Sequence, residues 1–440
     1  MGAAHVLADE QLPAGYEVDG LRPSAVAQPG SAEEVAQLVR LAAKEKLAVI
    51  PMGGRTKLGV GASPHRYDLA IDLTRLDRVL AFDPGDLTLG VQGGIRLEQL
   101  NATLAAQRQF LPLAPPFAEQ ATIGGILAAN SSTPLRHAYG AARGFVLGME
   151  FVTGEGAQVK SGGRVVKNVT GYDLHKLLIG ALGTLAIITR VNFRTFPLPH
   201  AERTFVASFA GAKESLALCQ AIAQSPLQPR MVEVLDPQAA QILHSQGRLP
   251  VGQWSVVTAA GGDERVVERH AADLARMAEA AHSTGFLSLT DDEKSLLQGR
   301  IREFPKHMME FSPAAAILRI SVLPSHMPEL IERASEVTRR NQVPSAMLVR
   351  ASGLVYVALV PPGRDAAALA SLARTATALI QESSAAEIGG FPIIEFCPTE
   401  LKSQVNVWGP TRGDFVLMER LKRVFDPQCI LSPGRFVGGI

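Results

Sequence analysis

The stretch Pro51-Met-Gly-Gly-Arg-Thr-Lys-Leu-Gly59 is the most informative part of the chain, because a short apolar strand runs there into a glycine loop. The residues before it, Leu47–Pro51, have the apolar pattern of a buried strand. Gly53 and Gly54 follow at once, and glycines let a backbone approach a diphosphate and direct several N–H donors at it. Taken alone, such a glycine pair is more typical of a surface turn.

The remaining loop residues add polar groups, and rival nucleotide motifs are absent. Thr56 can supply a hydroxyl, and Arg55 or Lys57 can supply positive charge. The GxxxxGK[ST] pattern of a P-loop does not occur. Gly59-Val-Gly61 is only part of a GxGxxG fingerprint, and no strand precedes it. The interpretation of the loop therefore depends on the motifs that follow it.

Several further motifs follow in a defined order. They are Thr122-Ile-Gly-Gly125, Asn130, Arg136 with Tyr139-Gly140 and Arg143, Gly171-Tyr-Asp-Leu174, Gly183-Thr-Leu-Ala-Ile-Ile-Thr189 and Phe425-Asp-Pro-Gln-Cys-Ile-Leu-Ser-Pro-Gly-Arg435. This order resembles the FAD-binding PCMH-type family, the vanillyl-alcohol oxidase and p-cresol methylhydroxylase group. The resemblance covers about residues 22–199 and returns at the C-terminal motif. It implies a two-part PCMH-type FAD-binding domain.

The resemblance also implies which residues bind FAD. Residues 52–57 would wrap the pyrophosphate, while Ile187 and Ile188 would offer backbone groups to a ring system, although both could equally be core. The full expected set is Met52, Gly53, Gly54, Arg55, Thr56, Lys57, Pro115, Thr122, Gly124, Gly125, Asn130, Gly140, Ile187 and Ile188. Covalent flavin in this family uses a His or Cys, often just after the glycines. Arg55, Thr56 and Lys57 stand there, so we expect non-covalent FAD.

The second half of the chain predicts an α+β fold with one antiparallel sheet. Apolar strands such as Thr204–Phe209 and Ala316–Val322 alternate with Ala-rich helices such as Arg265–Ala281. We interpret this region as a cap or substrate domain. The expected division is an N-terminal extension over 1–21, the FAD-binding domain over 22–199, the α+β cap domain over 200–400 and a C-terminal segment over 401–440 that returns to the FAD domain.

The histidines of related hydroxy-acid enzymes are missing. Relatives that oxidise D-2-hydroxy acids carry an HxGDGN-type motif near the C-terminus, with a following Glu-His, whereas the last histidine here is His326. In this absence, and in Val166-Lys-Asn168 and Leu318-Arg-Ile-Ser321, the chain resembles the FAD-binding E-subunit family of bacterial glycolate oxidase. That resemblance implies a second flavoprotein subunit, which oxidises the small 2-hydroxy acid, and an iron–sulfur subunit. Arg319 is the cation that we would test for substrate or partner contact; a strand-edge salt bridge is at least as good an explanation.

The composition of the chain argues against several other classes of protein and of binding site. The 440 residues carry 43 basic and 42 acidic side chains, so no nucleic-acid partner is expected. The three cysteines form no CxxC pair, which predicts no iron–sulfur cluster, no metal site and a reducing compartment. The N-terminus lacks a signal-peptide pattern, and no apolar run approaches the roughly 20 residues of a membrane span. We therefore expect a cytoplasmic protein that reaches a membrane only through partners.

Three functions remain open on these observations. The first is an FAD-binding subunit of a glycolate-oxidase-like dehydrogenase complex, active within that complex. The second is a stand-alone FAD-linked oxidoreductase of another hydroxy acid or alcohol, with a catalytic base that the sequence does not identify. The third is a non-catalytic assembly subunit, a reading that Arg55 in place of a loop glycine keeps open.

Overall fold

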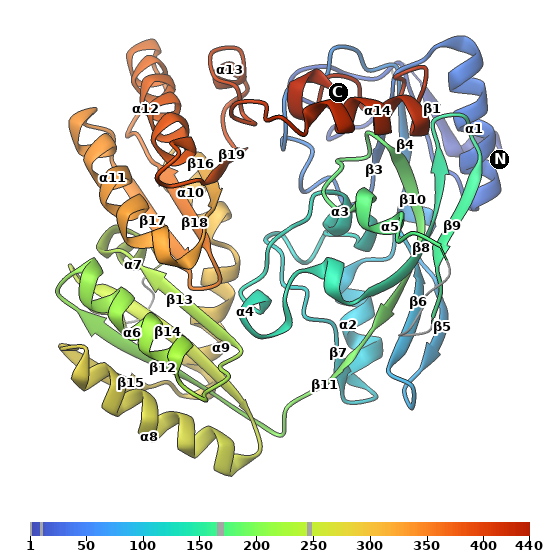
Figure 1. Cartoon of the computed structure of the whole chain (residues 1–440). Helices are drawn as coiled ribbons and strands as arrows, with labels where there is room; N and C mark the ends of the chain where they lie inside the picture. Colours follow the sequence, from blue (N-terminus) through green and yellow to red (C-terminus); the bar gives the residue numbers. More distant parts are fainter. Residues whose placement is uncertain (1, 9–11, 165–170, 244–248) are drawn as a thin grey trace. The chain divides into compact units, whose positions relative to one another are not determined.

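The computed structural model describes residues 2–8, 12–164, 171–243 and 249–440, so the Val166-Lys-Asn168 motif lies outside the described residues. The chain divides into two compact units (Figure 1). Unit 1 comprises Met1–Ser131, Ala141–Leu198 and Thr411–Ile440, and unit 2 comprises Ser132–Gly140 and Pro199–Pro410.

Two segments belong to a different unit from the one that the sequence predicts. Ser132–Gly140 was expected in the FAD-binding domain, but it belongs to unit 2. Its short helix α4 (Arg136–Tyr139) packs against strand β13 (Met231–Leu235). Residues 401–410 also belong to unit 2, where the backbone N–H of Ile394 donates to the carbonyl of Val407 at 2.7 Å. Both placements depend on contacts between distant parts of the chain, which local sequence patterns do not reveal.

Unit 1 contains a four-stranded sheet with the order β1-β2-β4-β3. Its strands are β1 (Val6–Ala8), β2 (Ala25–Ala27), β3 (Val49–Met52) and β4 (Leu69–Asp72). Strand β4 pairs in parallel with both β2 and β3, and β1 joins β2 antiparallel, so part of the expected N-terminal extension is a strand of this sheet.

Helix α1 (Ala32–Glu45) connects β2 to β3 in this sheet. The Ser31 side chain accepts a hydrogen bond from the N–H of Glu34, which caps the N-terminus of the helix. The apolar face of α1, including Val35 and Val39, packs in one core cluster with Val49 of β3. This packing holds β3 in place directly before the glycine loop.

The second sheet of unit 1 is antiparallel, with the order β5-β6-β10-β8-β9. Its strands are β5 (Val79–Asp83), β6 (Thr88–Gln92), β8 (Val146–Thr153), β9 (Gln158–Gly162) and β10 (Ala186–Arg194). Strands β8 and β9 pair as a hairpin around Gly154-Glu-Gly156. Helices α2 (Leu97–Ala105), α3 (Ile123–Ala128) and α5 (His175–Leu178) and the two-stranded pair β7 (Gln109–Phe110) and β11 (Phe196–Pro197) complete this part.

The C-terminal segment returns to unit 1 beside the glycine loop. After helix α14 (Phe415–Phe425), the N–H of Val49 donates to the carbonyl of Ile430, and the N–H of Ser432 donates back to Val49, both at 2.8 Å. The terminal motif therefore extends the pairing of β3. Within the described residues, no helix combines the length and apolar character that crossing a bilayer requires.

Unit 2 is built on an eight-stranded antiparallel sheet, as the sequence predicts for the cap region. The strand order is β15-β12-β14-β13-β17-β18-β16-β19. Besides β13, the strands are β12 (Ala201–Phe209), β14 (Trp254–Gly262), β15 (Gly285–Ser288), β16 (Ala316–Ser321), β17 (Ser345–Arg350), β18 (Leu354–Leu359) and β19 (Phe391–Phe396).

Two groups of helices pack on this sheet (Figure 1). One contains α6 (Ala212–Gln224), α8 (Glu264–Ala280), α11 (Met327–Arg340) and α12 (Ala366–Ser384). The other contains α7 (Pro237–Leu243), α9 (Asp291–Arg302) and α10 (Phe304–Phe311). Helix α13 (Thr399–Lys402) follows β19.

Candidate functional site

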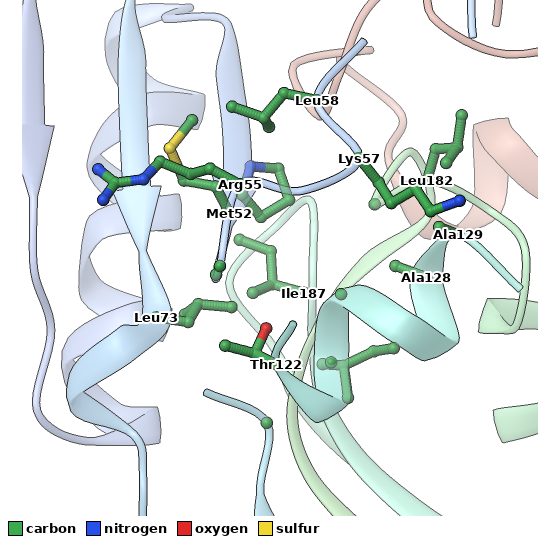
Figure 2. A pocket seen from close by; sticks show the side chains of 18 of the residues that line it. Met52, Arg55, Lys57, Leu58, Leu73, Thr122, Ala128, Ala129, Leu182 and Ile187 are labelled. Atoms are coloured by element: carbon green, nitrogen blue, oxygen red, sulfur yellow. The ribbon is translucent and has the colours of Figure 1, made fainter. Parts of the chain in front are cut away.

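The glycine loop forms one wall of a pocket in unit 1, which holds about 720 Å³ of space including its open mouth (Figure 2). The loop comes directly after β3. Helix α3 and the segment before it form a second wall, and residues at the start of β10 also line the pocket. The lining residues are Pro51–Leu58, Leu73, Gly93, Thr122, Gly124, Gly125, Ala128, Ala129, Leu182, Gly183, Ala186, Ile187, Ile188 and Arg435.

Two loop glycines are required by close packing. A Cβ on Gly54 would lie 1.7 Å from the carbonyl oxygen of Gln120, and a Cβ on Gly53 would lie 2.1 Å from Thr122 Oγ1. Real Cβ atoms do not approach other heavy atoms this closely. These glycines therefore let the loop backbone lie directly against the segment that enters α3.

The loop backbone offers a set of hydrogen-bond donors. Within the described part of the chain, the N–H groups of Gly53, Gly54, Arg55 and Thr56 donate to no other residue. All four residues line the pocket. Successive unpaired N–H groups in a tight loop form an anion-binding concavity, so this wall can hold the oxygens of a diphosphate.

Thr122 places a hydroxyl in the same pocket. The residue is 2% exposed, and its Oγ1 has no hydrogen-bond partner among the described residues. Buried hydroxyls are normally hydrogen-bonded, so this oxygen is expected to meet a ligand or water. The donor set of the loop and this hydroxyl together fit the phosphate part of a nucleotide.

The Arg55 side chain contacts the ring of Tyr16. Its backbone φ is +60°, a left-handed conformation that favours glycine, and its guanidinium carbon lies 4.5 Å from the centre of the Tyr16 ring. Figure 2 shows the Arg55 and Lys57 side chains leaving the loop in different directions. The Tyr16 hydroxyl donates to Asp72 at 2.6 Å, and burial, followed by this bond, raises the pKa of Tyr16. The Arg55 side chain therefore makes a structural contact with Tyr16, while its backbone lines the pocket.

Arg435 of the terminal motif holds the end of the loop through hydrogen bonds to backbone carbonyls. The residue is 3% exposed, and its guanidinium donates to the carbonyl of Leu58 and, at 2.8 Å, to the carbonyl of Val60. Burial lowers the pKa of Arg435 to about 10. The sequence resemblance marked the terminal motif but did not assign Arg435 to the site, because its place under the loop depends on a contact between residues 375 positions apart.

The structure brings most of the expected FAD-binding residues together. The expected residues that line the pocket are Met52, Gly53, Gly54, Arg55, Thr56, Lys57, Thr122, Gly124, Gly125, Ile187 and Ile188. Pro115, Asn130 and Gly140 do not line it. Asn130 instead follows the end of α3 with a φ of +45° beside Gly180, and Gly140 follows α4 in unit 2. The apolar lining that sequence reasoning missed, including Leu73, Ala128 and Leu182, carries no motif of its own.

Two family models match the chain. Residues 23–162 match the FAD binding domain, and residues 198–358 and 409–436 match the C-terminal domain of FAD linked oxidases. The first match includes the glycine loop and α3, and the second includes the terminal motif with Arg435.

Curated relatives span nearly the whole chain. A glycolate oxidase subunit, GlcD of Bacillus subtilis, is 22% identical over 418 residues, which is 94% of this chain and 88% of that protein. A D-2-hydroxyglutarate dehydrogenase of Xanthomonas citri pv. viticola is 28% identical over 425 residues, with 94% and 89% covered.

Solved structures have the same fold. The substrate-bound structure of p-cresol methylhydroxylase matches with a TM-score of 0.80 at 16% identity, covering 99% of this chain and 94% of that one. A 4-ethylphenol oxidase from Gulosibacter chungangensis matches with a TM-score of 0.77 at 18% identity, with 99% and 94% covered. These matches confirm the PCMH-type fold that the sequence motifs predict.

Proposed function

Because this chain is an FAD-linked oxidoreductase of the PCMH-type fold, we propose that it is the FAD-binding subunit of a glycolate-oxidase-like 2-hydroxy-acid dehydrogenase complex. Its FAD is bound non-covalently. Its partners are a second flavoprotein subunit, which oxidises the acid, and an iron–sulfur subunit that accepts the electrons. The protein is cytoplasmic and contacts a membrane only through these partners.

The unpaired donors of the glycine loop are the observation that carries the FAD assignment. The N–H groups of Gly53 to Thr56 and the Thr122 hydroxyl would hold the pyrophosphate. The apolar lining, with Ile187 and Ile188 of β10, would receive a ring system and exclude water from it. Among the described residues that line the pocket, none is His or Cys, which favours a dissociable cofactor. When bound, FAD supplies a two-electron acceptor for hydride and a donor of single electrons.

The missing histidine motif supports a role within a complex. The chain resembles hydroxy-acid dehydrogenases over almost all of its length, yet its sequence has no HxGDGN motif and no following Glu-His. A hydroxy acid needs a base for its hydroxyl proton as its hydride leaves, and these histidines are the expected source. A chain that keeps the FAD loop without them is suited to passing electrons that another subunit has taken from the substrate.

Purification of the chain with and without its partners tests this proposal. We expect the isolated chain to be yellow, to release all of its FAD on acid precipitation, and to turn over glycolate and D-lactate negligibly with a dye acceptor. A tagged chain purified from its native host should bring down a second flavoprotein and an iron–sulfur protein. Turnover by the isolated chain at ordinary enzyme rates, about 1–1000 per second, would refute the subunit role. A colourless chain that cannot be reconstituted with FAD would refute the cofactor assignment.

Arg435 gives a sharper test of the loop. We expect Arg435→Met to weaken FAD binding about tenfold or more, because the carbonyls of Leu58 and Val60 lose a charged donor and the loop shifts from its binding position. Arg423→Met, on the exposed side of α14, is the matched control and should leave the affinity unchanged. The affinity is measured by titrating the apoprotein with FAD and following the quenching of flavin fluorescence. Equal affinities for the two variants would show that Arg435 does not position the loop.

A further inference from the structure

Tyr16 lies against the glycine loop, although it belongs to the segment that the sequence predicts as an N-terminal extension. The residue is 4% exposed and packs in one apolar cluster with Ile50 and Met52 of β3. Leu58, at the end of the loop, is partly buried against the same cluster. Met52 and Leu58 also line the pocket of unit 1. The N-terminal segment therefore forms part of the support of this pocket.

The segment around Tyr16 is also fixed by contacts outside the glycine loop. Val18 is 1% exposed and exchanges two backbone hydrogen bonds with Leu21, at 2.9 and 3.0 Å. The Arg22 guanidinium donates to the carbonyl of Leu12 at 3.1 Å, which closes the segment on itself. The Tyr16 ring therefore offers the loop a surface whose position does not depend on the loop alone.

The Tyr16 ring contacts the loop residue that has the least favourable backbone conformation. Among residues 51–59, φ is positive only at Arg55, and side chains other than glycine rarely adopt this conformation. The Arg55 guanidinium carbon lies 4.5 Å from the centre of the ring, a distance at which a cation and an aromatic face attract each other. No hydrogen bond or ion pair with any described residue reaches the Arg55 side chain. The ring contact is therefore what holds it.

The Tyr16 hydroxyl connects the same side chain to a second part of the pocket. It donates to Asp72 Oδ2 at 2.6 Å, and Asp72 is 2% exposed. The other oxygen, Asp72 Oδ1, accepts from the N–H and the hydroxyl of Thr74 at 3.0 and 2.7 Å. This carboxylate caps the short 3-10 helix Leu73–Arg75, and Leu73 lines the pocket. Tyr16 thus links the glycine loop to the turn that carries Leu73.

We propose that Tyr16 is a positioning residue for FAD, which holds the glycine loop in its binding conformation through Arg55. The φ of Arg55 sets the direction of the Thr56 N–H relative to those of Gly53 and Gly54, so the donors converge only in this conformation. A loop that is already held in its bound conformation loses less entropy on binding. The inference rests on the proposed function only in taking this loop as the FAD site, and it requires neither a substrate nor a partner subunit.

A double-mutant cycle on the full-length apoprotein tests the role of Tyr16, with FAD affinity measured by quenching of flavin fluorescence. Glycine accepts a positive φ without strain, so Arg55→Gly removes the ring contact and the need for it. A cation–ring attraction at an exposed site corresponds to about a two- to fivefold change in affinity. We therefore expect Tyr16→Leu to weaken FAD binding about fivefold in the chain with Arg55, and about twofold or less in the Arg55→Gly background.

Two further variants separate the ring from the hydroxyl and the charge from the strain. Tyr16→Phe keeps the ring and loses the bond to Asp72, so it should weaken FAD binding less than Tyr16→Leu does. Arg55→Met keeps a side chain at the unfavourable φ but loses the cation, so it should bind FAD more weakly than Arg55→Gly. Arg55 is exposed, so this second comparison does not depend on whether Tyr16→Leu folds.

Tyr172→Leu, at a tyrosine that is 90% exposed, is the matched control and should bind FAD as the unaltered chain does. Circular dichroism and urea unfolding of each apoprotein establish that the variants are folded. Equal losses from Tyr16→Leu in both backgrounds, or equal affinities of Arg55→Met and Arg55→Gly, would overturn the positioning role. In a chain that binds FAD, either result refutes this inference alone, whereas an unaltered chain that binds no FAD refutes the proposed function as well.

Discussion

Gly54→Ala is expected to weaken FAD binding at least about 100-fold. The new Cβ would lie 1.7 Å from the Gln120 carbonyl oxygen and 3.3 Å from the Ala121 Cα, so only a backbone shift can relieve the contact. That shift moves the loop N–H groups away from Thr122, which lies directly against the loop. Each hydrogen bond to a charged phosphate is worth about 1.5–3 kcal/mol, so losing two accounts for the expected change.

The same loop contains a matched control. A Cβ on Gly59 would have no heavy atom within 4 Å, and Gly59 does not have a positive φ, so Gly59→Ala should bind FAD normally. Affinity is measured by FAD titration of the apoprotein, and circular dichroism establishes that both variants are folded. If Gly54→Ala and Gly59→Ala bound FAD equally well, the loop would not be the pyrophosphate wall.

Lys422→Met is expected to lower the free energy of unfolding by about 3–5 kcal/mol. The Lys422 ammonium is buried and donates to Asp426 at 2.7 Å, to the Thr184 carbonyl at 2.8 Å and to the Leu431 carbonyl at 2.9 Å. Asp426 is 0% exposed and also accepts from the N–H groups of Ile430 and Leu431. Methionine fills the volume but leaves the Asp426 carboxylate buried without its cation, which is the costly change.

This ion pair also holds the segment that pairs with β3, the strand that leads into the glycine loop. Residues Ile430 to Ser432 pair with Val49 of β3, so loss of the Lys422 contacts should increase hydrogen exchange in residues 49–60. Urea unfolding gives the stability, and Arg423→Met on the exposed side of the same helix is the control. A Lys422→Met protein that unfolds at the same urea concentration as this control would contradict the expectation.

Much of the fold could be predicted from local signals. Gly53 and Gly54 after an apolar strand, the capped helix that begins after Ser31, and the hairpin at Gly154-Glu-Gly156 are all patterns of neighbouring residues. Each reflects a backbone requirement that acts over a few positions: close approach, a satisfied helix end or a tight turn. The PCMH-type fold and FAD were predicted from a family resemblance, which the ordered motifs from Thr122-Ile-Gly-Gly125 to the terminal Pro-Gly-Arg435 carry.

Other features could not be predicted because they depend on contacts between distant segments. Arg435 reaches the loop carbonyls of Leu58 and Val60 only because the chain returns to β3 after unit 2. The assignment of Ser132–Gly140 to unit 2 depends on packing against β13, and no motif marks it. The contact of Arg55 with the Tyr16 ring, 39 positions earlier, also depends on the fold and has no local signal.

The sequence by itself therefore determined the class of fold and the position of the glycine loop, because both are expressed in short sequence motifs. Only the tertiary structure decided which polar groups meet. It paired Lys422 with Asp426 in the core, placed Thr122 directly against the loop, and joined Tyr16 to both Arg55 and Asp72. Charges and hydrogen-bond donors act through space, so their partners depend on which strands pair and on where the chain returns to an earlier segment. The order of residues along the chain does not show either.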